Sequence, residues 1–201
     1  MKIILVRHGQ TQWNQVERFR GQIDVPLNET GLAQAEAAAS RIAARWSPSA
    51  VYSSSLSRAT VTAQKIAQPF GLTVIPIPGL MDINFGEWQG LSVEEAQERW
   101  PDQLWNWIHA PQQVIVPGGE SFLTAQSRAL NAINELVIKH SGETIVLVSH
   151  TVINRLILLG ILGLGMERFW TLRQDNCAIN VLEADPGRYV LVTMNDTCHL
   201  H

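Results

Sequence analysis

The chain has 201 residues, close to the upper size of one compact domain, and 46% of them are hydrophobic, as in ordinary globular proteins. A formal net charge of -3 without any run of Lys or Arg argues against a nucleic-acid partner, which requires clustered cations. The longest apolar stretch, residues 152–165, is interrupted by Asn154 and Arg155 and is too short to cross a bilayer, so we expect no membrane partner.

Cysteine usage and the N-terminal sequence indicate the compartment. Cys177 and Cys198 are too few for a disulfide scaffold and lack the spacing of a zinc site. Such isolated thiols are typical of a reducing compartment, in which they pack as small apolar side chains. The first nine residues (MKIILVRHG) have neither the length nor the cleavage site of a signal peptide. We therefore expect a cytoplasmic protein.

Hydrophobic periodicity predicts strands that alternate with helices. The first helix follows from the helical spacing of Leu32, Ala35, Ile42 and Trp46, with N-cap chemistry at Asn28. The predicted elements are, in chain order, a strand at 2–6, a helix after Asn28 that ends by Pro48, a strand at 50–52, a helix from the serine cluster at 53–55 to residue 67, a strand at 73–77, a long helix at 120–140, a strand at 144–148, a helix from about 151, and paired strands at 178–183 and 189–194 joined over 185–187.

Residues 80–118 differ from this pattern. They are rich in Trp, Pro and polar residues and contain short helical stretches near 92–100 and 102–109, which is typical of a cap beside a site. We therefore predict a single domain over 1–201 with a cap-like insertion at about 80–118. Its fold class is a three-layer α/β/α sandwich with a mostly parallel central sheet and a small helical cap.

Two predicted strands end in a histidine. Residues 3–6 run into Arg7 and His8, and residues 145–148 run into Ser149 and His150. If the strands are parallel neighbours, both imidazoles enter one crevice, because ligands bind at the carboxyl ends of such strands. Arg58 lies one helical turn after the serine cluster, where a helix N-terminus attracts anions. Together, Arg7, His8, Arg58 and His150 would carry up to four positive charges, which predicts a site for a dianionic phosphoryl group.

Other chemical interpretations are weaker. A single histidine after a strand is usually structural, but two such endings with two arginines favour function. His8, His150 and a carboxylate would provide zinc ligands, yet the adjacent guanidinium groups repel a divalent ion. No glycine-rich nucleotide motif follows a strand. We expect neither a metal nor a cofactor.

Several segments together resemble the histidine phosphatase superfamily, whose members are phosphoglycerate mutase-like. The resemblance extends over nearly the whole chain. It is carried by residues 5–14 (LVRHGQTQWN), 24–28 (DVPLN) with Gly31, 52–59 (YSSSLSRA), 85–90 (FGEWQG), 117–121 (PGGES) and 148–150 (VSH).

The resemblance implies catalytic roles for named residues. His8 is similar to the nucleophile that accepts the phosphoryl group, and three residues are similar to the phosphate clamp: Arg7, Arg58 and His150. Asp82 stands where the family usually carries a glutamate as general acid, and it is one methylene shorter. Glu87 is the alternative acid, although we expect it to face outward beside Trp88.

Further substrate contacts are expected around this centre. Asn14 matches another phosphate contact of the family, and Gln22 is expected to touch the substrate as well. Arg20 replaces a frequent Gln and Thr151 replaces a common Gly; Thr151 still offers its backbone N–H. Arg20 has the alternative of a surface arginine. His199, near the C-terminus, is either a substrate contact folded over the pocket or a solvated terminal histidine.

Hydrolysis is favoured over phosphoglycerate-mutase-type transfer, because the cap is compact and residues 91–117 carry a single Arg or Lys, Arg99. Residues 149–152, 175–177 and 197–200 resemble bacterial metal-independent phosphoserine phosphatases, but Phe85 stands where those enzymes carry a histidine. The substrate is thus a small phosphorylated metabolite, with phosphoserine one possibility. A catalytically weak phosphate-binding regulatory module stays an alternative, and a homodimer through the cap tryptophans stays open.

Overall fold

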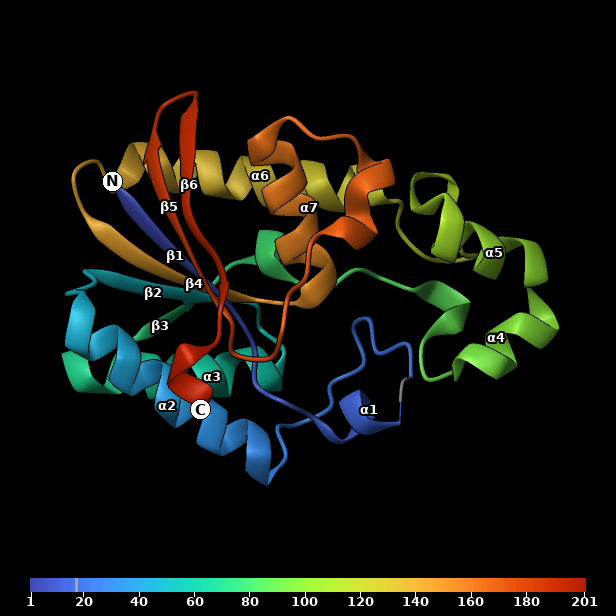
Figure 1. Cartoon of the computed structure of the whole chain (residues 1–201), viewed down its shortest axis with the longest axis horizontal. Helices are drawn as coiled ribbons and strands as arrows, with labels where there is room; N and C mark the ends of the chain where they lie inside the picture. Colours follow the sequence, from blue (N-terminus) through green and yellow to red (C-terminus); the bar gives the residue numbers. More distant parts are fainter. Residues whose placement is uncertain (17) are drawn as a thin grey trace.

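The computed structural model describes residues 1–16 and 18–201, and a mixed sheet forms the centre of this part of the chain (Figure 1). Among the described residues, the sheet has six strands in the order β3-β2-β4-β1-β5-β6. Strands β1 to β4 are mutually parallel, whereas β5 pairs antiparallel with β1, and β6 antiparallel with β5. The strands are β1 Lys2–Arg7, β2 Ala50–Ser53, β3 Val74–Pro76, β4 Thr144–Ser149, β5 Ile179–Asp185 and β6 Arg188–Asp196.

Helices cover both faces of this sheet and produce the predicted three layers. Helices α2 and α3 lie on one face and α6 and α7 on the other (Figure 1). Helices α4 and α5 lie at the short helical stretches predicted near 92–100 and 102–109. The α-helices are α1 Gln12–Gln15, α2 Glu29–Arg45, α3 Ser57–Ala67, α4 Val93–Arg99, α5 Pro101–His109, α6 Phe122–Lys139 and α7 Thr151–Leu162.

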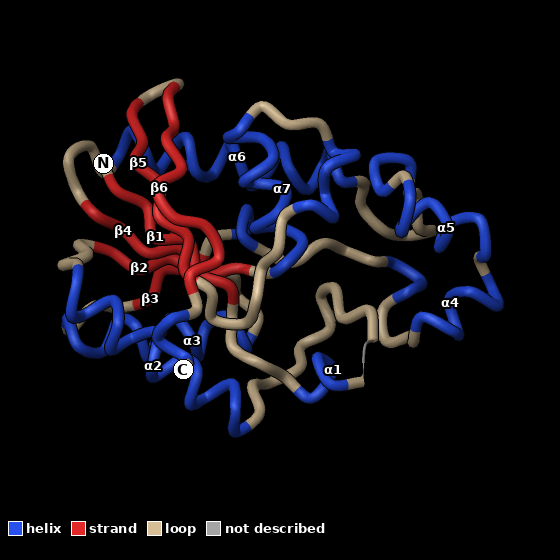
Figure 2. Tube along the Cα trace, viewed as in Figure 1, coloured by secondary structure: helices blue, strands red, loops and turns tan. Residues whose placement is uncertain are grey.

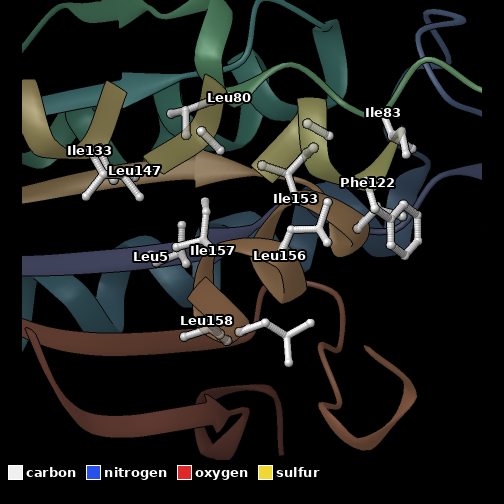
Figure 3. Close-up of a cluster of buried hydrophobic side chains, with 14 of the residues drawn as sticks. Leu5, Leu80, Ile83, Phe122, Ile133, Leu147, Ile153, Leu156, Ile157 and Leu158 are labelled. Atoms are coloured by element: carbon white, nitrogen blue, oxygen red, sulfur yellow. The ribbon is translucent and has the colours of Figure 1, made fainter. Parts of the chain in front are cut away.

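The apolar run of β1 supplies two separate cores. Ile3 and Leu5 face the core formed with α6 and α7, where Figure 3 shows Leu5 beside Ile157. Ile4 and Val6 face the core formed with α2 and α3. All four side chains are fully buried, and each contributes about 1.5–3 kcal/mol of hydrophobic stabilisation. A strand buried on both faces explains why its sequence is apolar without alternation.

The structure corrects some details of these elements. Helix α2 is capped by Asn28, whose Oδ1 accepts a hydrogen bond from the backbone N–H of Gly31 at 2.8 Å, but Leu32 on its first turn is 39% exposed. Strand β3 is shorter than the predicted 73–77; it lies at the sheet edge, where Pro76 lacks a backbone donor. Cys177 is buried as expected, whereas Cys198 is exposed and does not act as a core side chain.

The topology brings several loops to one end of the sheet. Strands β1 and β4 are adjacent, with Arg7 opposite Ser149, so both strands finish at the same level. Figure 2 shows the loops (tan) that leave the carboxyl ends of the strands toward α1 and the cap helices α4 and α5. The side chains at this edge form the candidate site.

Candidate active site

His8 and His150 meet at the carboxyl ends of β1 and β4. Their ring centroids are 5.1 Å apart, and the backbone N–H of His8 donates to the carbonyl oxygen of Ser149 at 3.0 Å. His8 is 1% exposed and His150 is fully buried. The two imidazoles that the sequence placed after separate strands are therefore neighbours in space.

The tautomer of His8 is fixed by the next residue. Its Nδ1 lies 2.6 Å from the carbonyl oxygen of Gly9, so Nδ1 carries the hydrogen and donates it. Burial first, and then electrostatic interaction with His150, whose protonation would compete with that of His8, and with the cation Arg58, holds the pKa of His8 well below its usual value. The imidazole is therefore neutral, and Nε2 keeps the lone pair that a nucleophile needs.

Arg58 orients His150. Arg58 Nε donates to Nδ1 of His150 at 3.3 Å, while its Nη1 and Nη2 donate to the carbonyl oxygens of Ile23 and Gly21 at 2.9 and 2.7 Å. Burial, and then Arg58, lowers the pKa of His150 well below its usual value, so this ring is neutral too. With Nδ1 accepting, the hydrogen sits on Nε2, a buried nitrogen without a hydrogen-bond partner among the described residues. His150 thus presents an N–H donor.

Arg7 supplies a second fixed cation. Its Nη1 donates to the carbonyl oxygen of Gln174 at 2.7 Å, and its buried Nε has no hydrogen-bond partner in the described part of the chain. Burial, and then Arg20 and Arg155, lowers the pKa of Arg7 to about 9, which keeps the guanidinium charged at neutral pH. Gln174, which the sequence did not single out, is held by Asn180 Oδ1, which accepts from its Nε2 at 2.8 Å.

Asp82 is buried beside the cations. Its Oδ2 accepts from Nη2 of Arg58 at 3.1 Å, and its Oδ1 accepts from the backbone N–H of Ile83 at 2.9 Å. Burial raises the pKa of Asp82, and the charges of Arg58 and Arg20 oppose that rise. The alternative acid, Glu87, is exposed while Trp88 beside it is buried, as expected. Geometry therefore favours Asp82 as the proton donor.

Two side chains donate hydrogen bonds to the backbone carbonyl oxygen of Asp82. Its carbonyl oxygen accepts from Nε2 of Gln22 at 3.0 Å and from Nη2 of Arg128 at 3.1 Å. Arg128 pairs in turn with both carboxylate oxygens of Glu120, at 2.7 and 3.0 Å. Gln22 was expected to touch the substrate, but the described lining of the cavity next to Asp82 does not include it. Its contact is with the acid's backbone.

A cavity of about 360 Å³ adjoins Arg7 and Asp82. His8, Arg58 and His150 are not part of its described lining. They are buried, with His8 next to Arg7 in the chain and with Arg58 and His150 within 3.1 and 3.5 Å of Asp82. The lining combines arginines with aromatic side chains: Arg7, Trp13, Asn14, Arg18, Phe19, Arg20, Gly21, Asp82, Phe85, Trp107, Thr151, Val152, Arg155, Trp170 and Gln174. Such a cavity suits a small anionic molecule.

Three expected substrate contacts line this cavity. Arg20 has a buried Nε without a hydrogen-bond partner among the described residues, and burial lowers its pKa to about 10, so it is not an ordinary surface arginine. Thr151 is the first residue of α7, so its backbone N–H has no partner within the helix. Asn14 Oδ1 accepts from the backbone N–H of Thr11 at 2.8 Å, which orients the amide at the cavity wall.

His199 lies elsewhere. One of its ring nitrogens, Nε2, is 3.1 Å from the carbonyl oxygen of Cys177, and the side chain is not in the described lining of the cavity. The structure therefore does not bring His199 to the substrate site, because its short C-terminal turn packs against the segment before β5. Nor is it a freely solvated terminal histidine.

Several lining residues were not identified from the sequence. Arg18 donates to the carbonyl oxygen of Gly90 at 2.6 Å and pairs with Glu95 at 3.1 Å. Arg155, on α7, was noted only as an interruption of an apolar stretch. Its position one helical turn after Thr151 was the available signal, because residues four apart share a helix face.

The arrangement can perform phosphoryl transfer. A neutral imidazole provides the nucleophile, guanidinium groups stabilise charge on equatorial phosphoryl oxygens, and a protonated carboxyl group can protonate a leaving alcohol. In the described part of the chain, no three His, Cys, Asp or Glu side chains are grouped as metal ligands.

Known proteins share both the sequence pattern and the fold. Residues 3–197 match the family model of the Histidine phosphatase superfamily (branch 1). Phosphoserine phosphatase 1 of Hydrogenobacter thermophilus is 36% identical over 200 residues, covering 100% of this chain and 94% of that protein. A metal-independent phosphoserine phosphatase of Arabidopsis thaliana is 36% identical over 201 residues, covering 99% and 83%. The solved structure of Bacillus stearothermophilus YhfR matches with a TM-score of 0.95 at 27% identity, covering 100% and 99%.

Among the described residues, no helix has both the length and the apolar character that crossing a membrane requires.

Proposed function

The chain belongs to the histidine phosphatase superfamily and is a phosphomonoester hydrolase of that family, and we propose that its reaction proceeds through a phosphohistidine at His8. The observation that carries this proposal is the 2.6 Å hydrogen bond from His8 Nδ1 to the carbonyl oxygen of Gly9. It leaves Nε2 as the only ring nitrogen with a lone pair, beside the cations that would bind the phosphoryl group.

In the first step, Nε2 of His8 attacks phosphorus and the bond to the ester oxygen breaks. The carboxylic proton of Asp82 passes to that oxygen, so a neutral alcohol leaves. Arg7, Arg58 and the Nε2–H of His150 stabilise the charge on the transferred group. The raised pKa of Asp82 supports this role, because the acid must hold its proton when the substrate arrives.

In the second step, Asp82 acts as the base. Its carboxylate takes a proton from water, the oxygen attacks phosphorus, and the bond to Nε2 of His8 breaks. Inorganic phosphate leaves, and both side chains return to their starting protonation states. No metal ion is required in either step, since the guanidinium groups supply the positive charge.

Phosphoserine is our first candidate substrate. The two phosphoserine phosphatases that resemble this chain over most of their length support it. Phe85 lines the cavity in place of the expected histidine, so part of the substrate contact differs. Hydrolysis is preferred to a mutase reaction because the described cap supplies no Lys or Arg to the lining.

Three further proposals concern the whole chain. We propose a single domain over residues 1–201, with the segment at about 80–118 as its cap, and a cytoplasmic location, supported by two free cysteines. A homodimer stays a hypothesis; exposed apolar cap side chains such as Trp105 and Ile108 support it. Sedimentation velocity would test it, and a monomer at all concentrations would reject it.

A panel of phosphate esters tests the proposed function. The panel contains phosphoserine, 3-phosphoglycerate, α-ribazole phosphate and fructose bisphosphates, compared by kcat/KM. We expect hydrolysis that resists EDTA, is inhibited by vanadate and disappears in His8→Ala. Equal activity of His8→Ala and the parent protein would reject the proposal, and activity lost with EDTA would indicate a metallohydrolase instead.

A further inference from the structure

Arg155 lines the cavity, and its guanidinium is held in place by neighbouring groups without being paired with a carboxylate. Its Nε donates to the carbonyl oxygen of Leu172 at 2.6 Å, and its guanidinium carbon lies 4.9 Å from the ring centroids of both Phe169 and Trp170. Among the described residues, no carboxylate forms an ion pair with Arg155. Burial lowers the pKa of Arg155 and Asp175 raises it, but the Asp175 carboxylate pairs with Arg173 at 2.8 Å. The terminal nitrogens of Arg155 therefore remain available to a ligand.

The other arginines of the described lining interact with different groups. Arg7 adjoins His8 at the phosphoryl end of the site, and Arg20 acts electrostatically on Asp82 and Arg58 at the same end. Arg18 is already neutralised by Glu95 at 3.1 Å. Arg20 Nε also lacks a partner among the described residues, but Asp82 acts on the charge of Arg20 and not on that of Arg155. We therefore assign Arg20 to the phosphoryl end and Arg155 to a second part of the substrate.

Its position on α7 places Arg155 one helical turn after the residue that follows His150. Thr151 begins the helix directly after His150, and Arg155 follows four residues later on the same face. A rise of 1.5 Å per residue separates the two positions by about 6 Å along the helix axis. This span is suited to a short molecule with a phosphate at one end and a second anionic group at the other.

We propose that Arg155 is a specificity-determining residue that binds a carboxylate on the leaving-group part of the substrate. The substrate class is then short phosphorylated carboxylic acids. This inference rests on the proposed phosphatase function and adds the recognition of the non-phosphoryl half. A planar guanidinium matches a carboxylate with two parallel hydrogen bonds, whereas a second phosphate dianion would call for more than one uncommitted cation.

The surroundings of Arg155 favour such a role. Stacking against Phe169 and Trp170 and the hydrogen bond to Leu172 hold the guanidinium in one orientation before the substrate binds. A preorganised side chain loses little conformational entropy on binding, so more of the interaction appears as affinity. Lysine would keep the charge but lose both the stacking surface and the two-pronged geometry.

The test compares two esters that differ at one group. 3-Phosphoglycerate carries a carboxylate where glycerol 3-phosphate carries a hydroxymethyl group. The readout is the ratio of their kcat/KM values, which does not depend on the fraction of folded enzyme. We expect the parent protein to prefer the acid, and Arg155→Gln to reduce that ratio roughly 10- to 100-fold, the loss expected for a charged hydrogen-bonded pair. Arg168→Gln, an exposed arginine outside the described lining, should leave the ratio unchanged.

The outcomes separate this inference from the proposed function. An unchanged ratio in Arg155→Gln, or a parent protein without preference for the acid, overturns the carboxylate assignment while hydrolysis itself stands. A bisphosphate preferred over both esters, with that preference lost in Arg155→Gln, also overturns it, because the second anion is then a phosphate. If the parent protein hydrolyses neither of these esters nor p-nitrophenyl phosphate, the proposed function itself fails.

Discussion

Nη2 of Arg58 donates a hydrogen bond to Oδ2 of Asp82 over 3.1 Å, and both side chains are buried. Burial raises the pKa of Asp82, and the adjacent guanidinium opposes that rise only in part. A carboxyl group in such a position can give up a proton in one step and take one in the next.

Asp82→Asn should lower kcat for alkyl phosphate esters by about 10²- to 10⁴-fold, the usual contribution of general acid catalysis. The loss in the transfer step should be much smaller for p-nitrophenyl phosphate, whose leaving group needs no proton. In the parent protein kcat/KM should fall as pH rises through the raised pKa of Asp82, and Asp82→Asn should lack this decrease. Glu87→Gln is the matched control; if it were the variant that lost activity, the assignment of the acid would be wrong.

Gln22→Ala separates positioning from substrate contact. Because Gln22 Nε2 donates to the backbone carbonyl oxygen of Asp82, its removal should lower kcat about tenfold, consistent with the loss of a supporting hydrogen bond. KM should change little, and the deficit should be smaller for p-nitrophenyl phosphate than for phosphoserine. A higher KM with unchanged kcat would instead indicate the direct substrate contact predicted from sequence.

Stability should fall as pH decreases below about 6.5, the ordinary pKa of histidine. The pKa values of His8 and His150 are lowered by folding, so between the folded and unfolded values the unfolded chain binds more protons and acid favours unfolding. The pKa of Asp82 is raised by folding, so at lower pH the folded chain binds the extra proton and acid favours the folded state there. This offsets at most one of the two protons that the histidines contribute.

Urea unfolding at a series of pH values measures this effect. His8→Asn should reduce the slope of unfolding free energy against pH by up to about 1.4 kcal/mol per pH unit. His109→Asn, at an exposed histidine, serves as the control. Identical slopes in the parent protein and in His8→Asn would mean that His8 is not held neutral by the fold.

Gly9→Ala should destabilise the protein by about 1–3 kcal/mol, as is usual for an overpacked position. A Cβ at residue 9 would lie 2.4 Å from the carbonyl oxygen of Gly31, and a backbone atom cannot turn away as a side chain can. The shift would also disturb the acceptor of the His8 Nδ1 hydrogen bond. Thermal unfolding and kcat measured on the same preparation check both consequences, and a variant unchanged in both would contradict this packing.

The sequence predicted the site best where strand topology decides the geometry. Once residues 2–6 and 144–148 are parallel neighbours, their ends must meet, so His8 and His150 could be brought together without coordinates. The roles of Gln22 and Arg128 could not be predicted, because they depend on contacts with a carbonyl oxygen about 60 and 46 residues away along the chain. Hydrophobic periodicity reports which helix face is buried and does not report what a polar side chain there will meet.

The sequence missed the lining residue Arg155 and wrongly suggested another, His199. Arg155 interrupts an apolar helix, and its spacing from Thr151 shows only a shared helix face; its contacts with Phe169 and Trp170 come from the segment after α7. His199 seemed able to reach the pocket because chain termini are usually unconstrained, but the contact with Cys177 holds it away. Both outcomes depend on packing between distant segments.

Trapping the phosphorylated enzyme tests the central claim most directly. The protein is mixed with a labelled phosphate ester, quenched within the turnover time at alkaline pH, where phosphohistidine persists, and mapped by peptide mass spectrometry. The account predicts one phosphoryl group on the peptide that contains His8, stable to base, lost in acid and absent from His8→Ala. A pre-steady-state burst of released alcohol without any phosphorylated peptide would contradict it. An adduct on another residue would contradict it as well.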